Sequence, residues 1–219
     1  MCIRDSQITR HAVENGILKG RYVNRLGFVL EGGSIESDGM GTLLTTSECL
    51  LSPNRNGQKN KVEIEEYLKS VFQVRQILWL DDGYLAGDDT DSHIDTLARF
   101  CPADTIVYVQ CEDETDEHYE ALQAMEEQLH SFRTLNGEPY RLLALPMADK
   151  IVEEGERLPA TYANFLILNG TILYPTYNQP ENDRRACEVL QEAFPGYQMV
   201  GIDCRPLIKQ HGSLHCVTM

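Results

Sequence analysis

The sequence predicts an α/β protein built from repeated ββαβ units. Three successive windows of the 219 residues each contain two strand-like runs, a helix and a closing strand-like run, in that order. Each helical window has apolar side chains at helical spacing. One pair of strands is joined by Asn169-Gly170, a dipeptide typical of tight hairpins. A plain α+β domain with an accidental repeat is the alternative.

The predicted elements follow one another without a linker or a low-complexity segment. In the first window we expect strands 28–31 and 42–50, helix 60–72 and strand 76–80. In the second we expect strands 93–100 and 105–111, helix 116–132 and strand 140–145. In the third we expect strands 162–168 and 171–174, helix 184–194 and strand 198–203. Residues 213–219 are expected to begin a fourth unit as its first strand.

The composition and charge argue against several classes of protein. Hydrophobic residues make up 42% of the chain, which argues against a disordered composition. No apolar run reaches the length of a membrane span, and residues 1–10 contain no apolar segment of a signal peptide, so we expect a cytoplasmic protein. The net charge of −15 argues against nucleic acid as a partner and suits a cationic substrate.

The cysteine pattern indicates reduced thiols. The seven cysteines are odd in number and form no C-x-x-C pair, which argues against a disulfide framework and a zinc ribbon. They are Cys2, Cys49, Cys101, Cys111, Cys187, Cys204 and Cys216. Most of them should be buried as small hydrophobic residues.

Two short motifs carry polar side chains that could act on a ligand. In the predicted strand 93–100, His93 and Asp95 are two residues apart, so they share one face and can contact the same ligand. A surface pair is the alternative. Glu31 ends the predicted strand 28–31, and the two glycines after it permit close backbone approach or positive φ. Here a surface glutamate before a turn is the alternative.

Cys216 is the candidate nucleophile among the thiols. A thiol attacks as the thiolate, and a nearby imidazolium lowers its pKa. His215 is adjacent, but neighbouring residues of a strand face opposite sides, so we do not expect His215 to be the base. A buried inert thiol is the alternative interpretation.

An acidic loop precedes His93. Three carboxylates lie among residues 87–92, namely Asp88, Asp89 and Asp91. The loop could bind a hard cation, anchor a cationic substrate, or simply be solvated.

Several stretches occur together in a recognisable order. They are 31–39 (EGGSIESDG), 41–46 (GTLLTT), 51–56 (LSPNRN), 88–95 (DDTDSHID) and 212–218 (GSLHCVT). Together they resemble the agmatine deiminase and bacterial-type peptidylarginine deiminase family, from about residue 7 to the C-terminus.

The resemblance implies a fold and a division of the chain. The family fold is the pentein propeller, an α/β ring of five ββαβ units, of which this chain would hold about three complete units plus part of another. We expect residues 1–6 to be an unrelated or artefactual leader and residues 7–219 to be a partial pentein domain. The family's upstream motif with Trp and Asp has no counterpart here. The family often has Asn where Ser34 stands and Gly where Ser92 stands.

The resemblance also implies roles for individual residues. Cys216 matches the nucleophile and His93 the general acid/base. Asp95 and Glu31 match carboxylates that hold the guanidinium. We expect Asp89, in the acidic loop, to contribute to substrate binding.

The implied reaction is hydrolysis of a guanidino group. Agmatine would give N-carbamoylputrescine and ammonia through a covalent thiouronium, a step of polyamine biosynthesis toward putrescine. We expect a small cationic guanidino substrate, no cofactor, no metal, no nucleic acid and no membrane partner; a homodimer is compatible with the sequence. Three alternatives stay open: an arginine or peptidylarginine deiminase giving citrulline, a metal-dependent hydrolase using Asp89, His93 and Asp95, and an inactive pentein-like protein.

Overall fold

The chain divides into two compact units. The computed structural model describes residues 8–23, 25, 27–88 and 92–219, and the units are 1–30 and 31–219. In the first unit, helix α1 (Ile8–Glu14) buries none of its side chains. The boundary expected after residue 6 lies outside the described residues and stays a prediction.

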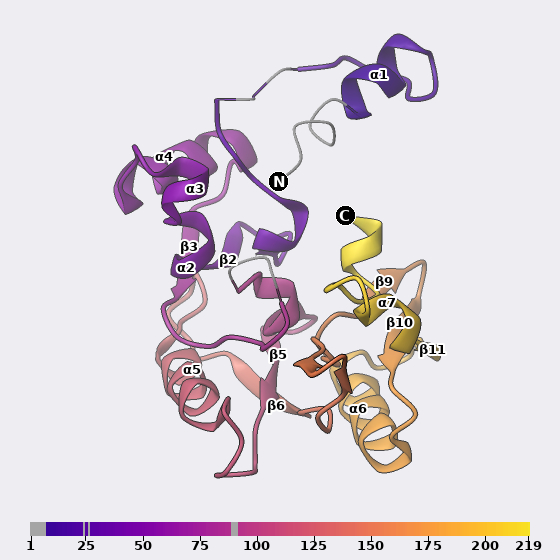
Figure 1. The fold of residues 1–219 in the computed structure, drawn as a ribbon. Helices are drawn as coiled ribbons and strands as arrows, with labels where there is room; N and C mark the ends of the chain where they lie inside the picture. Colours follow the sequence, from indigo (N-terminus) through magenta and orange to yellow (C-terminus); the bar gives the residue numbers. More distant parts are fainter. Residues whose placement is uncertain (1–7, 24, 26, 89–91) are drawn as a thin grey trace. The chain divides into compact units, whose positions relative to one another are not determined.

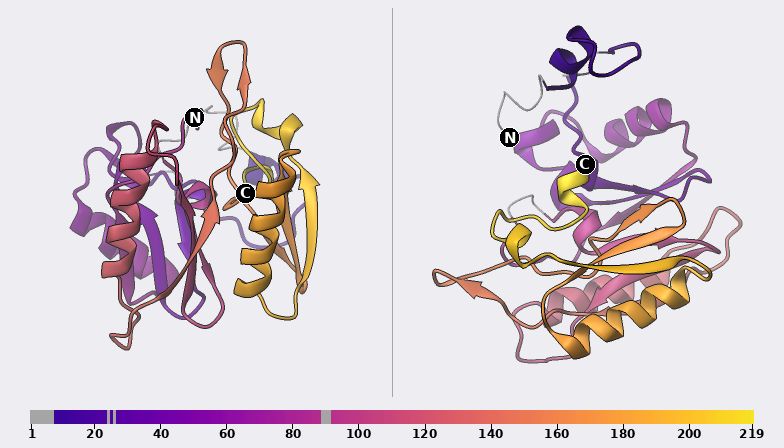
Figure 2. Two further views of the ribbon diagram at one scale, coloured as in Figure 1. Left: turned by 90° about the horizontal axis from the view of Figure 1, so that it is seen from below. Right: turned by 90° about the vertical axis from the view of Figure 1, so that its right-hand side faces the viewer.

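Residues 31–219 contain three three-stranded sheets, each formed by one ββαβ repeat (Figures 1 and 2). In each repeat the first two strands pair antiparallel and the strand after the helix pairs parallel to the second. The first repeat contains β1 (Ile35–Ser37), β2 (Thr42–Thr46), α2 (Ser47–Leu50), α3 (Pro53–Asn56), α4 (Lys61–Phe72) and β3 (Gln76–Leu80). The second contains β4 (Ala98–Cys101), β5 (Thr105–Gln110), α5 (Tyr119–Ser131) and β6 (Arg141–Pro146). The third contains β9 (Leu166–Leu168), β10 (Thr171–Thr176), α6 (Pro180–Ala193) and β11 (Gln198–Asp203).

Shorter elements connect the repeats or follow them. A small hairpin, β7 (Val152–Glu153) and β8 (Glu156–Arg157), precedes the third repeat, and α7 (Arg205–Ile208) follows it. Three 3-10 helices carry candidate site residues or lie beside them: η2 (Gly32–Ser34), η3 (Ile94–Thr96) and η4 (Cys216–Thr218).

The helices join neighbouring repeats into one core. Helix α5 packs on β5 of its own repeat and on β3 of the first, while α6 packs on β10 and β11 and also on β5 and β6 of the second. Buried side chains from all three repeats belong to a single hydrophobic cluster. Helix α6 has 14 residues, and no helix in the described part of the chain is long and apolar enough to cross a membrane.

The predicted repeats are confirmed, and several elements match closely. Strands β3 and β11 have the predicted bounds. Helix α4 begins one residue after its predicted start because Asn60 is its N-cap, in a capping box with Glu63. Asn169 and Gly170 both have positive φ, 49° and 79°, as a two-residue hairpin turn requires.

Local capping shortens two of the predicted strands. The predicted strand 42–50 stops at Thr46, whose side chain accepts a hydrogen bond from Cys49 N and starts α2. The predicted strand 93–100 begins only at Ala98. Before it, Thr96 N and Thr96 Oγ1 both donate to His93 O and form the turn of η3.

Three further strand predictions were wrong in whole or in part. Residues 28–31 form no strand, and of 162–168 only Leu166–Leu168 is a strand. Residues 213–219 form no strand but end in η4. Residues 213–219 do not pair as a strand because Asn164 Oδ1 accepts from both His215 N and Cys216 N and so occupies donors that a sheet would need.

Candidate active site

Glu31, His93 and Asp95 meet around Gly33. The His93 ring donates from Nε2 to Glu31 Oε2 at 2.9 Å. A methyl group on Gly33 would lie 2.7 Å from His93 Nδ1 and 2.9 Å from Asp95 Oδ1, closer than real contacts allow. Only glycine fits here, so the predicted close backbone approach is confirmed, although the φ of Gly33 is not positive.

A turn, and not a strand, brings His93 and Asp95 to the same place. His93 directly precedes η3 and Asp95 lies within it. Ser92, at the start of the turn, has a φ of 56°, a conformation that favours glycine. The prediction that the two side chains share a face held, although its premise of a strand was wrong.

Glu31 is held as a carboxylate by two cationic neighbours. Arg55 Nε lies 2.7 Å from Glu31 Oε2, the same oxygen that His93 contacts. The hydrogen bond from His93 lowers the pKa of Glu31 most; burial opposes it, and Arg55 adds to the lowering, which leaves the pKa at about 2. Arg55 therefore pairs with a local acid.

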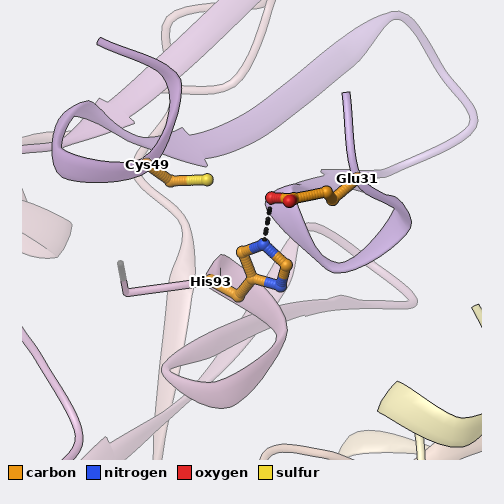
Figure 3. Close-up of side chains that lie close together, drawn as sticks. All are labelled: Glu31, Cys49 and His93. Carbon is orange, nitrogen blue, oxygen red and sulfur yellow. Dashed lines mark hydrogen bonds and ion pairs between the residues drawn. The ribbon is translucent and has the colours of Figure 1, made fainter. Parts of the chain in front are cut away.

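His93 keeps its proton at neutral pH. Burial lowers its pKa, but hydrogen bonds with Cys49 and Glu31 outweigh burial and raise the pKa to about 10. Cys49 is fully buried at the end of the turn that Thr46 caps. Figure 3 shows its sulfur pointing toward the Glu31 carboxylate and the His93 ring.

Asp95 lies at the centre of a second group of side chains. Its carboxylate is fully buried, and its Oδ2 accepts from His215 Nδ1 at 2.7 Å and from Asn164 Nδ2 at 3.0 Å. Within the described part of the chain, Asp95 Oδ1 has no hydrogen-bond partner. A buried acceptor without a donor is costly, so this oxygen is suited to a ligand that donates.

Cys216 lies beside Asp95 and Asn164. Its Sγ is 3.4 Å from Asn164 Oδ1 and 4.0 Å from Asp95 Oδ2. Among the described residues, no hydrogen bond joins this thiol to His93. Burial, and then the negative charge of Asp95, raise the pKa of Cys216 to about 11.

His215 occupies a buried position that the strand prediction had placed on the opposite face. Arg99 Nη2 lies 3.5 Å from His215 Nε2, and Arg99 Nε is 2.8 Å from Glu36 Oε2. A guanidinium can only donate, so His215 Nε2 accepts from Arg99 and Nδ1 carries the proton donated to Asp95. A chain of buried charged and polar groups thus leads from Glu36 to Asp95.

Sequence reasoning missed several residues of this site: Cys49, Asn164, His215 and Arg99. The sequence could have indicated two of them, because Asn164 and Arg99 are polar residues within the predicted strands 162–168 and 93–100. Asp89, predicted to bind substrate, lies outside the described residues. The metal set of Asp89, His93 and Asp95 therefore stays open. Potential ligand atoms of Glu31, Cys49 and His93 do lie within 4.8 Å of one another.

Comparison with known proteins assigns the family. A family profile described as Porphyromonas-type peptidyl-arginine deiminase matches residues 2–219. The chain belongs to this family, and its α/β fold is the pentein fold, of which three ββαβ units are present.

Individual relatives agree with this assignment. The agmatine deiminase of Pseudomonas fluorescens is 34% identical over 98% of this chain and 62% of its own length. A crystal structure of a Porphyromonas gingivalis protein, provisionally named an arginine deiminase, is 55% identical with a TM-score of 0.92, over 96% of this chain and 62% of its own. A Cys-to-Ser variant of C. jejuni agmatine deiminase with substrate bound is 41% identical with a TM-score of 0.88, over 98% of this chain and 62% of its own. The chain thus spans about three fifths of the length of these relatives.

Proposed function

We propose that the complete protein carrying this chain hydrolyses the guanidino group of a small cationic substrate. Agmatine is the substrate we favour, with N-carbamoylputrescine and ammonia as products. The observation that carries the proposal is the buried Asp95 carboxylate, which lies against Gly33 with His93 and within 4.0 Å of the Cys216 thiol. A carboxylate, an imidazole and a thiol around one buried acceptor are the groups that guanidino hydrolysis needs.

Asp95 and Glu31 suit the binding of a guanidinium. A planar guanidinium donates parallel N–H bonds to carboxylates, and Asp95 Oδ1 is free to accept one among the described residues. Glu31 is ionised at neutral pH because its pKa is about 2. Two carboxylates at the site would hold the guanidino carbon in a fixed position, which lowers the entropic part of the barrier.

The proposed reaction has two steps. Cys216 Sγ attacks the guanidino carbon and a C–S bond forms; the carbon–nitrogen bond to the leaving NH₂ then breaks as His93 gives it a proton, and ammonia departs. Water, deprotonated by the now neutral His93, attacks the thiouronium carbon. The C–S bond breaks, which releases the ureido product and restores the thiolate. The raised pKa of His93 agrees with the acid role in the first step.

The substrate would also activate its own nucleophile. As long as no bound cation offsets the negative charge of Asp95, the pKa of Cys216 is about 11, so the thiol is protonated at neutral pH. A bound guanidinium cation places a positive charge beside Asp95 and offsets its effect on the thiol. Binding and thiolate formation are therefore coupled: the thiol proton is released to solvent as the guanidinium binds, and the thiol of the free enzyme stays protonated.

Two observations favour agmatine over arginine. An arginine site needs a cation for the α-carboxylate, but Arg55, the one Lys or Arg inside the motif stretches that precede His93, is already paired with Glu31 at 2.7 Å. The net charge of −15 also suits a dication without a carboxylate. The second candidate is peptidylarginine, favoured by the family description, with citrulline in the peptide as product.

A substrate panel tests the proposal. Ammonia release by the complete protein is measured side by side from agmatine, free arginine and an arginyl peptide. We expect agmatine to give the highest kcat/KM. Faster release from the peptide would replace agmatine by peptidylarginine, and no release from any of the three would contradict guanidino hydrolysis itself.

A further inference from the structure

Cys49 is a buried thiol that the proposed reaction does not use. Its side chain has no exposed surface, yet it lies beside two further groups that can bind a metal ion, the Glu31 carboxylate and the His93 imidazole. One potential ligand atom from each of these three residues lies within 4.8 Å of the other two. Figure 3 shows the three side chains converging from separate segments of the chain.

The segments that carry Cys49 and His93 are tied to each other. Thr46 Oγ1, which caps the turn of Cys49, donates to Ser92 O at 2.8 Å. Ser92 Oγ in turn donates to Glu48 Oε2 at 3.1 Å. These bonds flank both Cys49 and His93, so the sulfur and the imidazole are held near each other before any ligand arrives, which reduces the entropy lost on binding.

The donor set selects the kind of ion. Thiolate, imidazole and carboxylate together are the ligands of zinc, whereas Ca²⁺ and Mg²⁺ prefer oxygen alone. Zinc bonds of about 2.0 to 2.3 Å put tetrahedral ligand atoms about 3.3 to 3.7 Å apart. The widest separation here would have to close by about 1 Å, a shift within reach of side-chain rotation.

Charge balance also favours a divalent ion. A Zn²⁺ ion would take the place of the proton that His93 Nε2 donates to Glu31 and would bind Cys49 as the thiolate. The ion, one thiolate and one carboxylate then sum to zero charge in a buried position, which avoids the cost of an uncompensated charge. Arg55 can keep its contact with the Glu31 carboxylate.

We propose that Glu31, Cys49 and His93 form a Zn²⁺ site whose occupation inhibits the enzyme. The ion takes His93 Nε2 and Glu31, so no proton can pass to the leaving ammonia and one carboxylate is lost to the substrate. Binding itself does not depend on the proposed function; only the inhibitory consequence rests on it.

Metal binding is tested without turnover. The complete, metal-stripped protein is titrated with Co²⁺, whose bond to a thiolate gives an intense near-ultraviolet charge-transfer band, and Zn²⁺ is then used to displace it. We expect the band in the wild-type protein and in two thiol controls, Cys216→Ser and Cys187→Ser. In Cys49→Ser we expect no band and at least a tenfold weaker Zn²⁺ affinity. A His93→Gln variant, which keeps the thiol, should also bind Zn²⁺ at least tenfold more weakly.

The outcomes separate the possible sites. A band that survives in Cys49→Ser, or one that disappears in Cys216→Ser, would overturn the proposal, as would a wild-type protein that gives no band. Circular dichroism of each variant checks its folding. If Cys49→Ser does not fold, His93→Gln decides, because unchanged Zn²⁺ affinity in that variant also overturns the site.

Inhibition is measured separately on ammonia release. Each variant's rate in Zn²⁺ is compared with its own rate in chelator. We expect Zn²⁺ to inhibit the wild-type protein and to require at least a tenfold higher concentration for Cys49→Ser. Equal inhibition of both proteins would place the inhibitory metal elsewhere. If the protein releases no ammonia, the proposed function fails while the Co²⁺ titration still decides the metal site.

Discussion

The two halves of the candidate site hold their ionisable groups in opposite ways. Around Glu31 and His93, contacts with charged or polarisable neighbours stabilise the ionised forms, so the carboxylate pKa falls to about 2 and the imidazole pKa rises to about 10. Around Cys216, burial and an unneutralised Asp95 favour the neutral thiol, with a pKa of about 11. One half is already in the state that the chemistry needs, and the other half lacks a positive charge. The proposed guanidinium substrate would supply that charge.

Replacing Cys216, the proposed nucleophile, should give the largest effect. In the complete protein, Cys216→Ser should lower kcat by at least about 10³-fold, roughly 4 kcal/mol of barrier, because a hydroxyl is far harder to ionise than a thiol in this environment. Stopped assays of ammonia release measure it. Cys187→Ser, on α6, is the matched control and should behave as wild type. A Cys216→Ser protein that keeps more than about a tenth of kcat contradicts the assignment.

Removing the central charge should separate binding from thiol ionisation. Asp95→Asn should lower kcat/KM for agmatine by about 10²-fold, because the guanidinium loses a charged partner. The same change should lower the pKa of Cys216 in the free protein, because the negative charge of Asp95 is, after burial, the largest cause of the raised pKa. Alkylation of Cys216, followed by mass spectrometry at about pH 8, should therefore become faster as turnover falls. Slower alkylation would break the proposed link between the two residues.

The Cys216 half should respond to pH as a thiol with a raised pKa. Thiolate forms as pH rises through the folded-state pKa of about 11, so alkylation of Cys216 in the free protein should accelerate about tenfold per pH unit from neutral pH to about pH 10. Peptide-resolved mass spectrometry follows Cys216 alone. A plateau that is reached near neutral pH would mean a depressed pKa and would remove the need for substrate activation.

Loosening the support of Asp95 should give a smaller effect. His215→Phe removes the donor to Asp95 Oδ2. In the proposed reaction Asp95 binds the substrate but transfers no proton, so this change should raise KM for agmatine by about tenfold with a lesser change in kcat. His215→Asn retains an amide donor near the Nδ1 position and should recover part of the loss. Equal losses in KM and kcat for both variants would indicate a packing role only.

The sequence could predict the features that depend on neighbouring residues, but not those that depend on contacts between distant residues. Strands such as β3 and β11 and the Asn169-Gly170 turn depend on local pattern, and they appeared as predicted. Glu31 and His93 were found because their motifs are local and familiar. The sequence marked Asn164 only as a polar residue in a predicted buried strand. The contacts of Asn164 and His215 could not be predicted locally, because they are hydrogen bonds between residues 51 and 120 positions apart.

Strand assignments failed where a side chain took over the backbone donors. The apolar and β-branched residues of 42–50 predict one strand. The Thr46 hydroxyl instead caps helix α2 within this segment, and the helix turns Cys49 toward His93. The residue pattern of 213–219 predicts a strand, but the Asn164 side-chain oxygen accepts hydrogen bonds from the N–H groups of His215 and Cys216. Neither event alters the hydrophobic periodicity, so only the structure shows that Cys49 lies near His93 and that His215 is buried.

The proposed role of Cys216 is tested most directly by identifying the thiol that carries the covalent intermediate. Agmatine is mixed with the complete protein, the reaction is quenched in acid over a time course, and each cysteine peptide is analysed for the mass of agmatine less ammonia. We expect this adduct to form on Cys216, to rise and decay with turnover, and to be absent from Cys49. An adduct on Cys49, or ammonia release that continues at the wild-type rate in Cys216→Ser, would contradict the proposed role.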